Sequence, residues 1–526
     1  MNTLTQLFAQ IPLAFTTDRA LPDTPISAVV FDSRQVQPGT IFVALAGVSQ
    51  DGHQYIPAAV QKGAAAVVGS KDITGLPVPY IRVEDTRPAL AYISAAFNGW
   101  PARKLTVLGV TGTDGKTTTS NLLYRILIEA GLKAGMISTV NAVIGDTEID
   151  TGFHVTTPDA PDVQRYLAQM VAAGLSHVVL ESTSHGLAQH RVTGCEYDIG
   201  VVTNITHEHL DYHGSYENYL ASKGRLFTML AETGPKPGGN IRLAVLNKDD
   251  RSYPYLDKLT TVKKITYSLQ ASADIWAEDM GEDERGVYFT AVTPAWRQPV
   301  HANLAGRYNI YNSLAAISAA VFGLGIAPDV AARGIAALAE VPGRMERIDL
   351  GQDFTAIVDF AHTPFALESA LRSARQFTRG RLIAVFGSAG LRDRAKRRMM
   401  AEVSAELADL TILTAEDPRT ESLDGILAEM AKAAEGKGGV EGKTFWRVPD
   451  RGEAIRLAVK MAQPGDMVLA CGKGHEQSMC FNTTEYLWDD RTAMRAAVAE
   501  RLGIEGYKMP YLPSSDKELD SWLKEK

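Results

Sequence analysis

The chain has 526 residues, 45% of them hydrophobic and 22% charged, with a formal net charge of −8. This length exceeds one hydrophobic core and predicts three or four domains, and the acidic balance argues against a nucleic-acid or membrane-surface partner. No apolar run is long enough to span a membrane, only three cysteines occur, and the first residues lack a signal-peptide pattern, so we expect no membrane insertion and a reducing, cytoplasmic setting.

The first hundred residues predict a small α/β domain, residues 1–100. "ISAVVFDS" (26–33) and "TIFVAL" (40–45) have the character of strands, and "YIPAAVQKGAAAVVG" (55–69) predicts a helix followed by a strand. "NGWPARK" (98–104) contains a glycine and a proline and is interpreted as a linker.

Short apolar runs then alternate with helical patterns over residues 101–342. Such runs suit parallel strands that are buried on both faces. The same alternation returns after the Pro342-Gly343 break and predicts a second doubly wound unit within residues 343–526, ending in a polar, peripheral tail. The predicted fold is therefore α/β with three domains: an N-terminal α/β domain, a central P-loop ATPase-like domain and a C-terminal Rossmann-like domain.

"GVTGTDGKTTT" (109–119) follows a predicted strand and opens a predicted helix. Gly112 and Gly115 permit close backbone approach, and Lys116-Thr117 would meet phosphates and Mg²⁺ at the helix N-terminus. Val110 stands where the common phosphate-loop pattern has glycine. The segment predicts a nucleotide site, and a glycine-rich turn without a ligand is the alternative.

Acidic and histidine side chains follow two further strands. Glu181 ends an apolar strand, where a Mg²⁺ ligand is expected beside a phosphate loop, and a solvated loop acid is the alternative. The segment 203–227 carries three histidines, but Asp211 occupies the position at which a His-Glu-x-x-His zinc motif needs its second histidine. Since the ends of parallel strands meet at one sheet edge, we expect these groups to converge with Thr117.

At these residues the chain resembles the Mur ligase family, ATP-dependent amide-bond ligases of peptidoglycan synthesis. Gly112–Thr117 match the family's Gly-Thr-x-Gly-Lys-Thr loop, which accommodates Val110. Further matching motifs are "DSR" (32–34), "DGH" (51–53), "TTPD" (156–159), "SHGLAQHRV" (184–192), "PGRMERI" (342–348), "DFAHTP" (359–364) and "GKGHE" (472–476). The chain is most similar to members that add the third residue, a diamino acid, to UDP-N-acetylmuramoyl-L-Ala-D-Glu, so its expected partners are small molecules.

The resemblance implies an ATP site, two Mg²⁺ ions and a modified lysine. The implied ATP-binding residues are Gly112, Thr113, Asp114, Gly115, Lys116, Thr117, Thr118, Asn312 (adenine), Arg344 (phosphates) and Asp359 (ribose). The implied metal ligands are Thr117, Glu181, His209 and Lys223, and the implied catalytic residues are Lys116, Glu181, His209 and Lys223. Lys223, in "YLASKGRLF", would be carbamylated by CO₂ to N6-carboxylysine, since oxygen ligands suit Mg²⁺. On its own it would pass for an ordinary surface lysine.

The resemblance also implies two substrate sites. The UDP-sugar-peptide would contact Ser33, Val48, Ser49, Gln50, Thr156, Thr157, Thr183, Gln189, Arg191 and Lys223. The incoming amino acid would contact Arg392, Glu416, Asp417, Pro418, Arg419, Gly472 and Glu476. The chain departs from the family at Glu208-His209, commonly Asp-His, and at Thr183, commonly Ser.

The stretch "EDPR" (416–419) stands where the family's meso-diaminopimelate enzymes have "DNPR". Arg419 favours a distal carboxylate and hence meso-diaminopimelate, whereas Asp417 in place of Asn leaves L-lysine or L-ornithine open. We expect a monomeric enzyme that forms an acyl phosphate and then an amide. A non-catalytic relative is the alternative, and a folylpolyglutamate synthetase is disfavoured by the N-terminal "DSR…DGH" unit.

Overall fold

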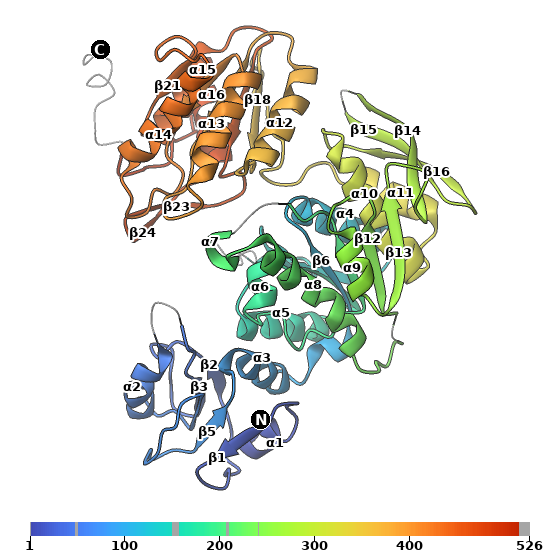
Figure 1. The fold of residues 1–526 in the computed structure, drawn as a ribbon, viewed down its shortest axis with the longest axis vertical. Coiled ribbons are helices and arrows are strands. Elements are labelled where there is room, and N and C mark those ends of the chain that lie inside the picture. The colour runs from blue at the N-terminus through green and yellow to red at the C-terminus, as the bar shows by residue number, and fades with distance from the viewer. Residues whose placement is uncertain are drawn as a thin grey trace.

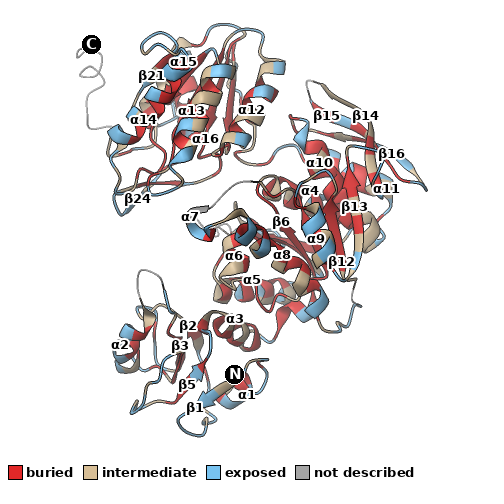
Figure 2. Ribbon diagram, viewed as in Figure 1, coloured by how far each residue is buried: buried red, intermediate tan, exposed pale blue. Residues whose placement is uncertain are grey.

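The computed structural model describes residues 2–47, 51–149, 157–206, 210–239, 241–283 and 285–514. It has the three-domain α/β fold, with one principal sheet in each domain, following one another along the chain (Figure 1). The strands form the buried layer of each domain, and the outer faces of the helices are exposed (Figure 2). No helix within the described ranges combines the length and apolar character needed to cross a membrane.

The N-terminal sheet has the strand order β1-β5-β4-β3-β2, parallel except for β1. Residues 98–104, interpreted as a linker, run between α3 and the first strand of the central sheet; within them Trp100 is only 5% exposed and Pro101–Lys104 form a 3-10 helix. Helix α3 packs against α5 of the central domain. The elements are α1 (Leu4–Phe8), β1 (Phe15–Thr17), β2 (Ala28–Val30), β3 (Thr40–Val43), α2 (Ile56–Gln61), β4 (Ala66–Gly69), β5 (Tyr80–Val83) and α3 (Thr86–Phe97).

The central sheet has eleven strands in the order β16-β15-β14-β13-β12-β11-β6-β10-β7-β8-β9. Its middle, from β14 to β7, is parallel, as the apolar runs predict, and antiparallel strands extend both ends. The strands are β6 (Thr106–Thr111), β7 (Ala134–Ile137), β8 (Ala142–Ile144), β9 (Thr147–Ile149), β10 (His177–Glu181), β11 (Ile199–Val202), β12 (Leu243–Asn247), β13 (Lys263–Ser268), β14 (Ile275–Asp283), β15 (Gly286–Val292) and β16 (Arg297–Ala302).

Helices cover both faces of this sheet. One apolar cluster holds residues of α4, α10 and α11, and a second holds residues of α5 and α8. The helices are α4 (Lys116–Glu129), α5 (Ala160–Ala172), α6 (Ser184–Ala188), α7 (Leu210–His213), α8 (Tyr216–Glu232), α9 (Tyr253–Leu259), α10 (Tyr308–Ser318) and α11 (Pro328–Ala336).

The C-terminal sheet has the order β17-β18-β22-β19-β20-β21, parallel except for β17. Its strands are β17 (Glu346–Ile348), β18 (Thr355–Asp359), β19 (Leu382–Phe386), β20 (Leu410–Leu413), β21 (Phe445–Arg447) and β22 (Met467–Cys471), with a separate hairpin, β23 (Ser478–Phe481) and β24 (Thr484–Leu487). Its helices are α12 (Pro364–Phe377), α13 (Ala395–Leu407), α14 (Leu423–Gly436), α15 (Arg451–Met461) and α16 (Asp490–Leu502). The start of the expected peripheral tail instead packs on this domain, since Leu512 is fully buried in its core.

Strand β6 lies between β10 and β11, and all three are parallel. The segments that follow them therefore leave the sheet at one edge, where the chain order of the strands changes direction. Crevices at such switch points are the usual ligand sites of open α/β sheets. This topology brings the phosphate loop, Glu181 and the start of segment 203–227 together.

Candidate active site

The loop between β6 and α4 has the geometry of an anion cradle. Gly112 has φ 154° and Gly115 has φ 81°, and a Cβ at either position would overlap a neighbouring side chain, Thr203 or Asn312 respectively. Among the described residues, no side chain caps the N-terminus of α4, where backbone N–H groups favour an anion. Lys116 lies at this N-terminus, and its Nζ donates to the carbonyl oxygen of Thr113 at 2.7 Å.

The segment after β11 braces this loop. The Asp114 amide donates to Asn204 Oδ1 at 3.0 Å, and Thr203 Oγ1 donates to the Asp114 carbonyl at 2.6 Å. The Thr206 amide donates to Thr113 Oγ1 at 2.9 Å. The cradle is thus held by a second strand end, and these bracing residues were not predicted, because the contacts join segments about 90 residues apart along the chain.

Glu181 lies beside the loop, fully buried. The Thr117 hydroxyl oxygen lies 3.2 Å from Glu181 Oε1 and 3.1 Å from Oε2, so the expected convergence of these two residues is observed. Thr139, which the sequence did not single out, also contacts both carboxylate oxygens. A carboxylate and a hydroxyl at this distance offer oxygen ligands to Mg²⁺.

Lys223 projects from α8 to the same loop. Its side chain is 2% exposed, and its Nζ donates to the Gly112 carbonyl at 2.5 Å and lies 4.6 Å from the centre of the Tyr219 ring. The alternative of a surface lysine is therefore wrong. A buried amine at the phosphate loop is placed where its charge state affects a bound nucleotide.

Some predicted residues lie outside the described part of the chain. They are Val48, Ser49, Gln50, Thr156 and His209. Among the residues that the structure describes, no group of three or more His, Cys, Asp and Glu side chains is placed to hold a metal. The expected metal ligands would not form such a group, because Thr117 and Lys223 belong to none of these four residue types.

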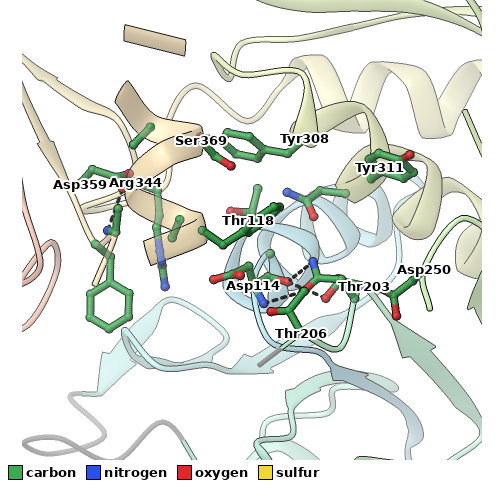
Figure 3. Close-up of a pocket in the computed structure, with 18 of the residues that line it drawn as sticks. Asp114, Thr118, Thr203, Thr206, Asp250, Tyr308, Tyr311, Arg344, Asp359 and Ser369 are labelled. Carbon is green, nitrogen blue, oxygen red and sulfur yellow. Dashed lines mark hydrogen bonds between the residues drawn. The ribbon is translucent and has the colours of Figure 1, made fainter. Parts of the chain in front are cut away.

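A cavity of 280 Å³ lies between the central and C-terminal domains and reaches the loop. Figure 3 shows Asp359 and Arg344 on one side and Asp114, Thr203 and Thr206 across from them. The predicted residues that line it are Asp114, Gly115, Thr118, Asn312, Arg344 and Asp359. Lining residues that the sequence did not reveal include Asn204, Asp250, Tyr308, Tyr311, His362 and Phe365. Aromatic rings, amides and a phosphate loop suit a nucleotide.

Two residues at the start of the C-terminal domain connect it to this cavity. Arg344 lies with its guanidinium carbon 4.3 Å from the centre of the Phe360 ring, and its Nη2 donates to Thr117 Oγ1 at 3.4 Å. Asp359 accepts from the backbone amides of Met345 and Ala361 at 2.7 and 2.8 Å. These contacts hold the first residues of the C-terminal domain, Arg344 and Met345, next to the phosphate loop.

A second cavity, of 210 Å³, adjoins the first and shares the loop, Arg344 and His362 with it. On the central side it is lined by Lys116, Thr117, Thr139, Glu181 and Thr183. On the C-terminal side it is lined by the predicted residues Arg392, Glu416, Asp417, Arg419, Gly472 and Glu476, and Pro418 is not among the residues lining it. The phosphate loop therefore faces the predicted amino-acid site across one continuous space.

The acidic side chains Asp417 and Glu476 of this second cavity have cationic partners. Asp417 accepts from Lys473 Nζ at 3.1 Å and from the Cys480 amide at 2.9 Å, and Lys473 also lies 2.5 Å from Glu476. Asp417 has φ 41°, a left-handed conformation that Asp and Asn both tolerate. The carboxylate of Asp417 thus has cationic neighbours within the protein: besides Lys473, Arg419 Nη2 lies 4.0 Å from Asp417 Oδ2, and Arg419 also donates to the Gly390 carbonyl at 2.8 Å.

Glu416 is buried at the base of this cavity, and its Oε2 has no hydrogen-bond partner within the described ranges. Burial raises the pKa of the Glu416 carboxyl from 4.5 to about 7, against the opposing influence of His362, Arg451 and Lys473. Gly472, with φ 113°, leaves room for it, because a Cβ there would overlap Glu416 Oε2. The folded protein therefore favours the neutral form of Glu416 more than the unfolded chain does.

This raised pKa predicts a pH-dependent stability difference. Relative to Glu416→Gln, the wild type has its full stability below pH 4.5 and loses up to ~3 kcal/mol as the pH rises from 4.5 through about 7, since the unfolded chain ionises Glu416 in this range while burial opposes its ionisation in the folded protein. Thermal unfolding midpoints of both proteins between pH 4.5 and 8 test this. The exposed Glu505→Gln serves as the control, and a difference that does not change with pH would contradict the expectation.

The residues expected to hold the muramoyl-dipeptide form a cluster next to Glu181. Thr157 Oγ1 donates to the Glu181 carbonyl at 3.1 Å and lies 3.0 Å from Thr183 Oγ1. Arg191 donates to the Thr157 carbonyl at 2.9 Å and to Gln189 Oε1 at 2.9 and 3.1 Å. Ser33 lies apart from this cluster, in the N-terminal domain, where its carbonyl accepts from Lys62 at 3.0 Å.

Comparison with known proteins gives matches along most of the chain. Three family models match: "Mur ligase family, catalytic domain" at residues 25–98, "Mur ligase middle domain" at 110–320, and "Mur ligase, glutamate ligase domain" at 343–474.

Two curated relatives are similar over nearly their whole length. The chain is 45% identical to a UDP-N-acetylmuramyl-tripeptide synthetase of Roseiflexus sp. (strain RS-1), over 91% of this chain and 96% of that protein. It is 40% identical to a UDP-N-acetylmuramoyl-L-alanyl-D-glutamate--2,6-diaminopimelate ligase of Geobacillus thermodenitrificans (strain NG80-2), over 95% and 99%. A solved structure of a ligase with the latter name matches with a TM-score of 0.63 and 31% identity, over 92% of this chain and 97% of that one.

Proposed function

The chain belongs to the Mur ligase family, whose members are ATP-dependent, amide-bond-forming ligases, and we propose that it adds 2,6-diaminopimelate to UDP-N-acetylmuramoyl-L-alanyl-D-glutamate in peptidoglycan synthesis. One observation carries the proposal: a cavity whose lining suits a nucleotide and a cavity lined by Arg392 and Arg419 meet at the phosphate loop. A reaction that transfers a phosphoryl group to a carboxylate and then delivers an amine needs this juxtaposition.

The reaction has two steps. The terminal carboxylate of the dipeptide attacks the γ-phosphorus of ATP, the bond to the β-phosphate oxygen breaks, and ADP and an acyl phosphate form. The amine of diaminopimelate then attacks the acyl carbon, loses a proton, and expels inorganic phosphate. Lys116 and Arg344 lie where they would neutralise the phosphates while the anionic carboxylate approaches. Closing the C-terminal domain over the loop would keep water from the acyl phosphate.

Members of the family use ATP and Mg²⁺, and the residues present fit the metal. Thr117, Glu181 and His209 would hold it, together with a carbamylated Lys223. The bound Mg²⁺ would supply charge neutralisation and alignment of the phosphates. Glu181 and the Thr117 hydroxyl already share one buried position, which supports their part of this set.

Carbamylation of Lys223 follows from the same chemistry. The neutral Nζ amine would attack the carbon of CO₂ and lose a proton, which yields a carbamate anion with two oxygens. A buried ammonium beside a metal would be repelled, whereas the carbamate oxygens would be suitable ligands.

The two arginines Arg392 and Arg419 in the second cavity favour diaminopimelate over L-lysine or L-ornithine. Asp417 already has two cationic neighbours, Lys473 at 3.1 Å and Arg419 at 4.0 Å, so it is less available to balance a distal ammonium. Arg419 and Arg392 line the same cavity and would hold a distal carboxylate. We therefore assign the selection of the amino acid to Arg419.

We expect Arg419→Ala to lower kcat/KM for meso-diaminopimelate by ~10²-fold, since a charge-assisted hydrogen bond contributes 1.5–3 kcal/mol. Turnover with meso-diaminopimelate, L-lysine and L-ornithine side by side measures this, and Arg447→Ala, whose side chain pairs with Glu441 at the surface, is the control. Preference of the wild type for L-lysine or L-ornithine would overturn the assignment, and absence of ADP release with all three would favour a non-catalytic relative.

We also propose domain boundaries at residues 100/101 and 342/343, a monomeric state and a cytoplasmic location. The boundaries are supported by the sheets, which lie within residues 15–83, 106–302 and 346–471. The UDP moiety would contact Ser33 and residues 48–50, and the muramoyl-dipeptide the cluster around Thr183 and Arg191.

A further inference from the structure

Thr139 holds both oxygens of Glu181 from the turn after β7, where its hydroxyl oxygen lies 3.5 Å from that of Thr117 in the phosphate loop. Its backbone amide donates to Glu181 Oε2 at 3.1 Å, and its hydroxyl donates to Oε1 at 2.9 Å. One residue therefore supplies one hydrogen bond to each oxygen of a fully buried carboxylate. Hydrogen bonds to an ionised carboxylate are stronger than hydrogen bonds between neutral groups, so they hold the carboxylate more firmly.

The pairing of strands β7 and β10 places Thr139 next to Glu181. Strands β7 and β10 are parallel neighbours, with Ile137 opposite Leu180, so the residues that follow them leave the sheet together. Ser138 closes the turn after β7, since its amide donates to the Asn141 carbonyl at 2.9 Å and its hydroxyl accepts from the Val140 amide at 3.2 Å. The turn is thus ordered before any ligand binds.

Thr117 cannot take over this role. Its hydroxyl has one proton and lies at nearly equal distances from both oxygens of Glu181, 3.2 and 3.1 Å. It also accepts from Arg344, at 3.4 Å, and its lone pairs would be needed for a metal. The hydrogen bonds that fix the plane of the carboxylate while Thr117 turns to a metal are then those of Thr139.

We propose that Thr139 is a positioning residue that orients Glu181 for Mg²⁺. The inference rests on the proposed function, in which Glu181 is a metal ligand. With one hydrogen bond from Thr139 to each oxygen, both oxygens keep lone pairs for Thr117 or a metal. Partners of this kind in other metal sites typically change metal affinity by roughly 10–100-fold when they are removed.

The test measures metal binding rather than turnover alone. Mn²⁺ is titrated into the full-length protein with saturating ADP, and free Mn²⁺ is followed by electron paramagnetic resonance. We expect Thr139→Val to weaken Mn²⁺ binding by roughly 10-fold or more, and Thr139→Ser, which keeps the hydroxyl, to stay within about 3-fold of the wild type. Thr260→Val is the matched control, because Thr260 is a buried threonine whose hydroxyl bonds to a carbonyl, that of Leu256, outside both cavities.

Glu181→Gln separates the two proposals. If Glu181→Gln weakens Mn²⁺ binding and Thr139→Val does not, the role of Thr139 is overturned and the metal site stands. If neither changes it, the proposed metal site itself fails. Thermal unfolding without metal or nucleotide is recorded for each variant, and equal weakening by Thr139→Val and Thr260→Val would also contradict the inference, since it would indicate a general effect of removing a buried hydroxyl.

Discussion

Lys116→Ala lowers the rate of ligation by ~10³-fold or more, the scale at which charge-neutralising groups act in phosphoryl transfer. The reason is the approach of two anions, a carboxylate and the γ-phosphate, at the N-terminus of α4, where Lys116 supplies the mobile positive charge. ADP release and formation of the tripeptide product, measured together, check this result.

The control for Lys116 is Lys133→Ala, an exposed lysine beyond the other end of the same helix. We expect this variant to keep the activity of the wild type. Retention of activity within tenfold by Lys116→Ala would remove the central role given to the loop.

Lys223→Ala lowers the rate by ~10²–10³-fold, comparable to the loss of one preorganised electrostatic group. A short carboxylate such as acetate or formate is expected to restore part of the activity, because it can occupy the space of the lost carbamate with the same oxygen donors. The wild type is also expected to slow when dissolved CO₂ is stripped and to recover with bicarbonate. A carbamate signal in ¹³C NMR after addition of ¹³C-bicarbonate, absent in Lys223→Ala, reports the modification directly.

Rescue must be specific to Lys223. Lys116→Ala serves as the comparison, because a carboxylate cannot replace a lost positive charge. Full activity of Lys223→Ala without any added carboxylate would contradict the carbamate, and so would equal rescue of both variants.

The strands near the site could be predicted because each is buried on both faces and therefore forms an unbroken apolar run. The four central strands β6, β10, β11 and β12 are of this kind. The antiparallel extensions were missed for the opposite reason. Strand β16, at one end of the sheet, reads Arg-Gln-Pro-Val-His-Ala and buries only Val300 and Ala302, so its sequence lacks that apolar pattern.

The residues of the site also fall into those that the sequence predicts and those that it does not. Gly112–Thr117 and Glu181 could be predicted because their residue types, each directly after an apolar strand, form a local sequence pattern. Thr139 and Asn204 could not, because their importance depends on which strand ends meet, and this is decided by the strand order β11-β6-β10-β7. His209 lies outside the described residues, so its part in the metal site stays a prediction.

The burial of Lys223 shows what the structure adds. A lysine on an amphipathic helix is most often at the surface, and the sequence alone does not show whether its side chain is buried. Only the packing of α8 against the loop places this amine at Gly112. Burial and proximity to the loop support the proposed modification of Lys223 with a physical argument that the motif alone did not supply.

The central claim is that ATP activates the substrate carboxylate as an acyl phosphate at the meeting point of the two cavities. The most direct measurement uses UDP-N-acetylmuramoyl-L-alanyl-D-glutamate labelled with ¹⁸O in the reacting carboxylate, together with ATP and meso-diaminopimelate. We predict that one ¹⁸O atom appears in the inorganic phosphate for each amide bond formed, as mass spectrometry of the phosphate will show. Unlabelled phosphate alongside tripeptide product would contradict the claim.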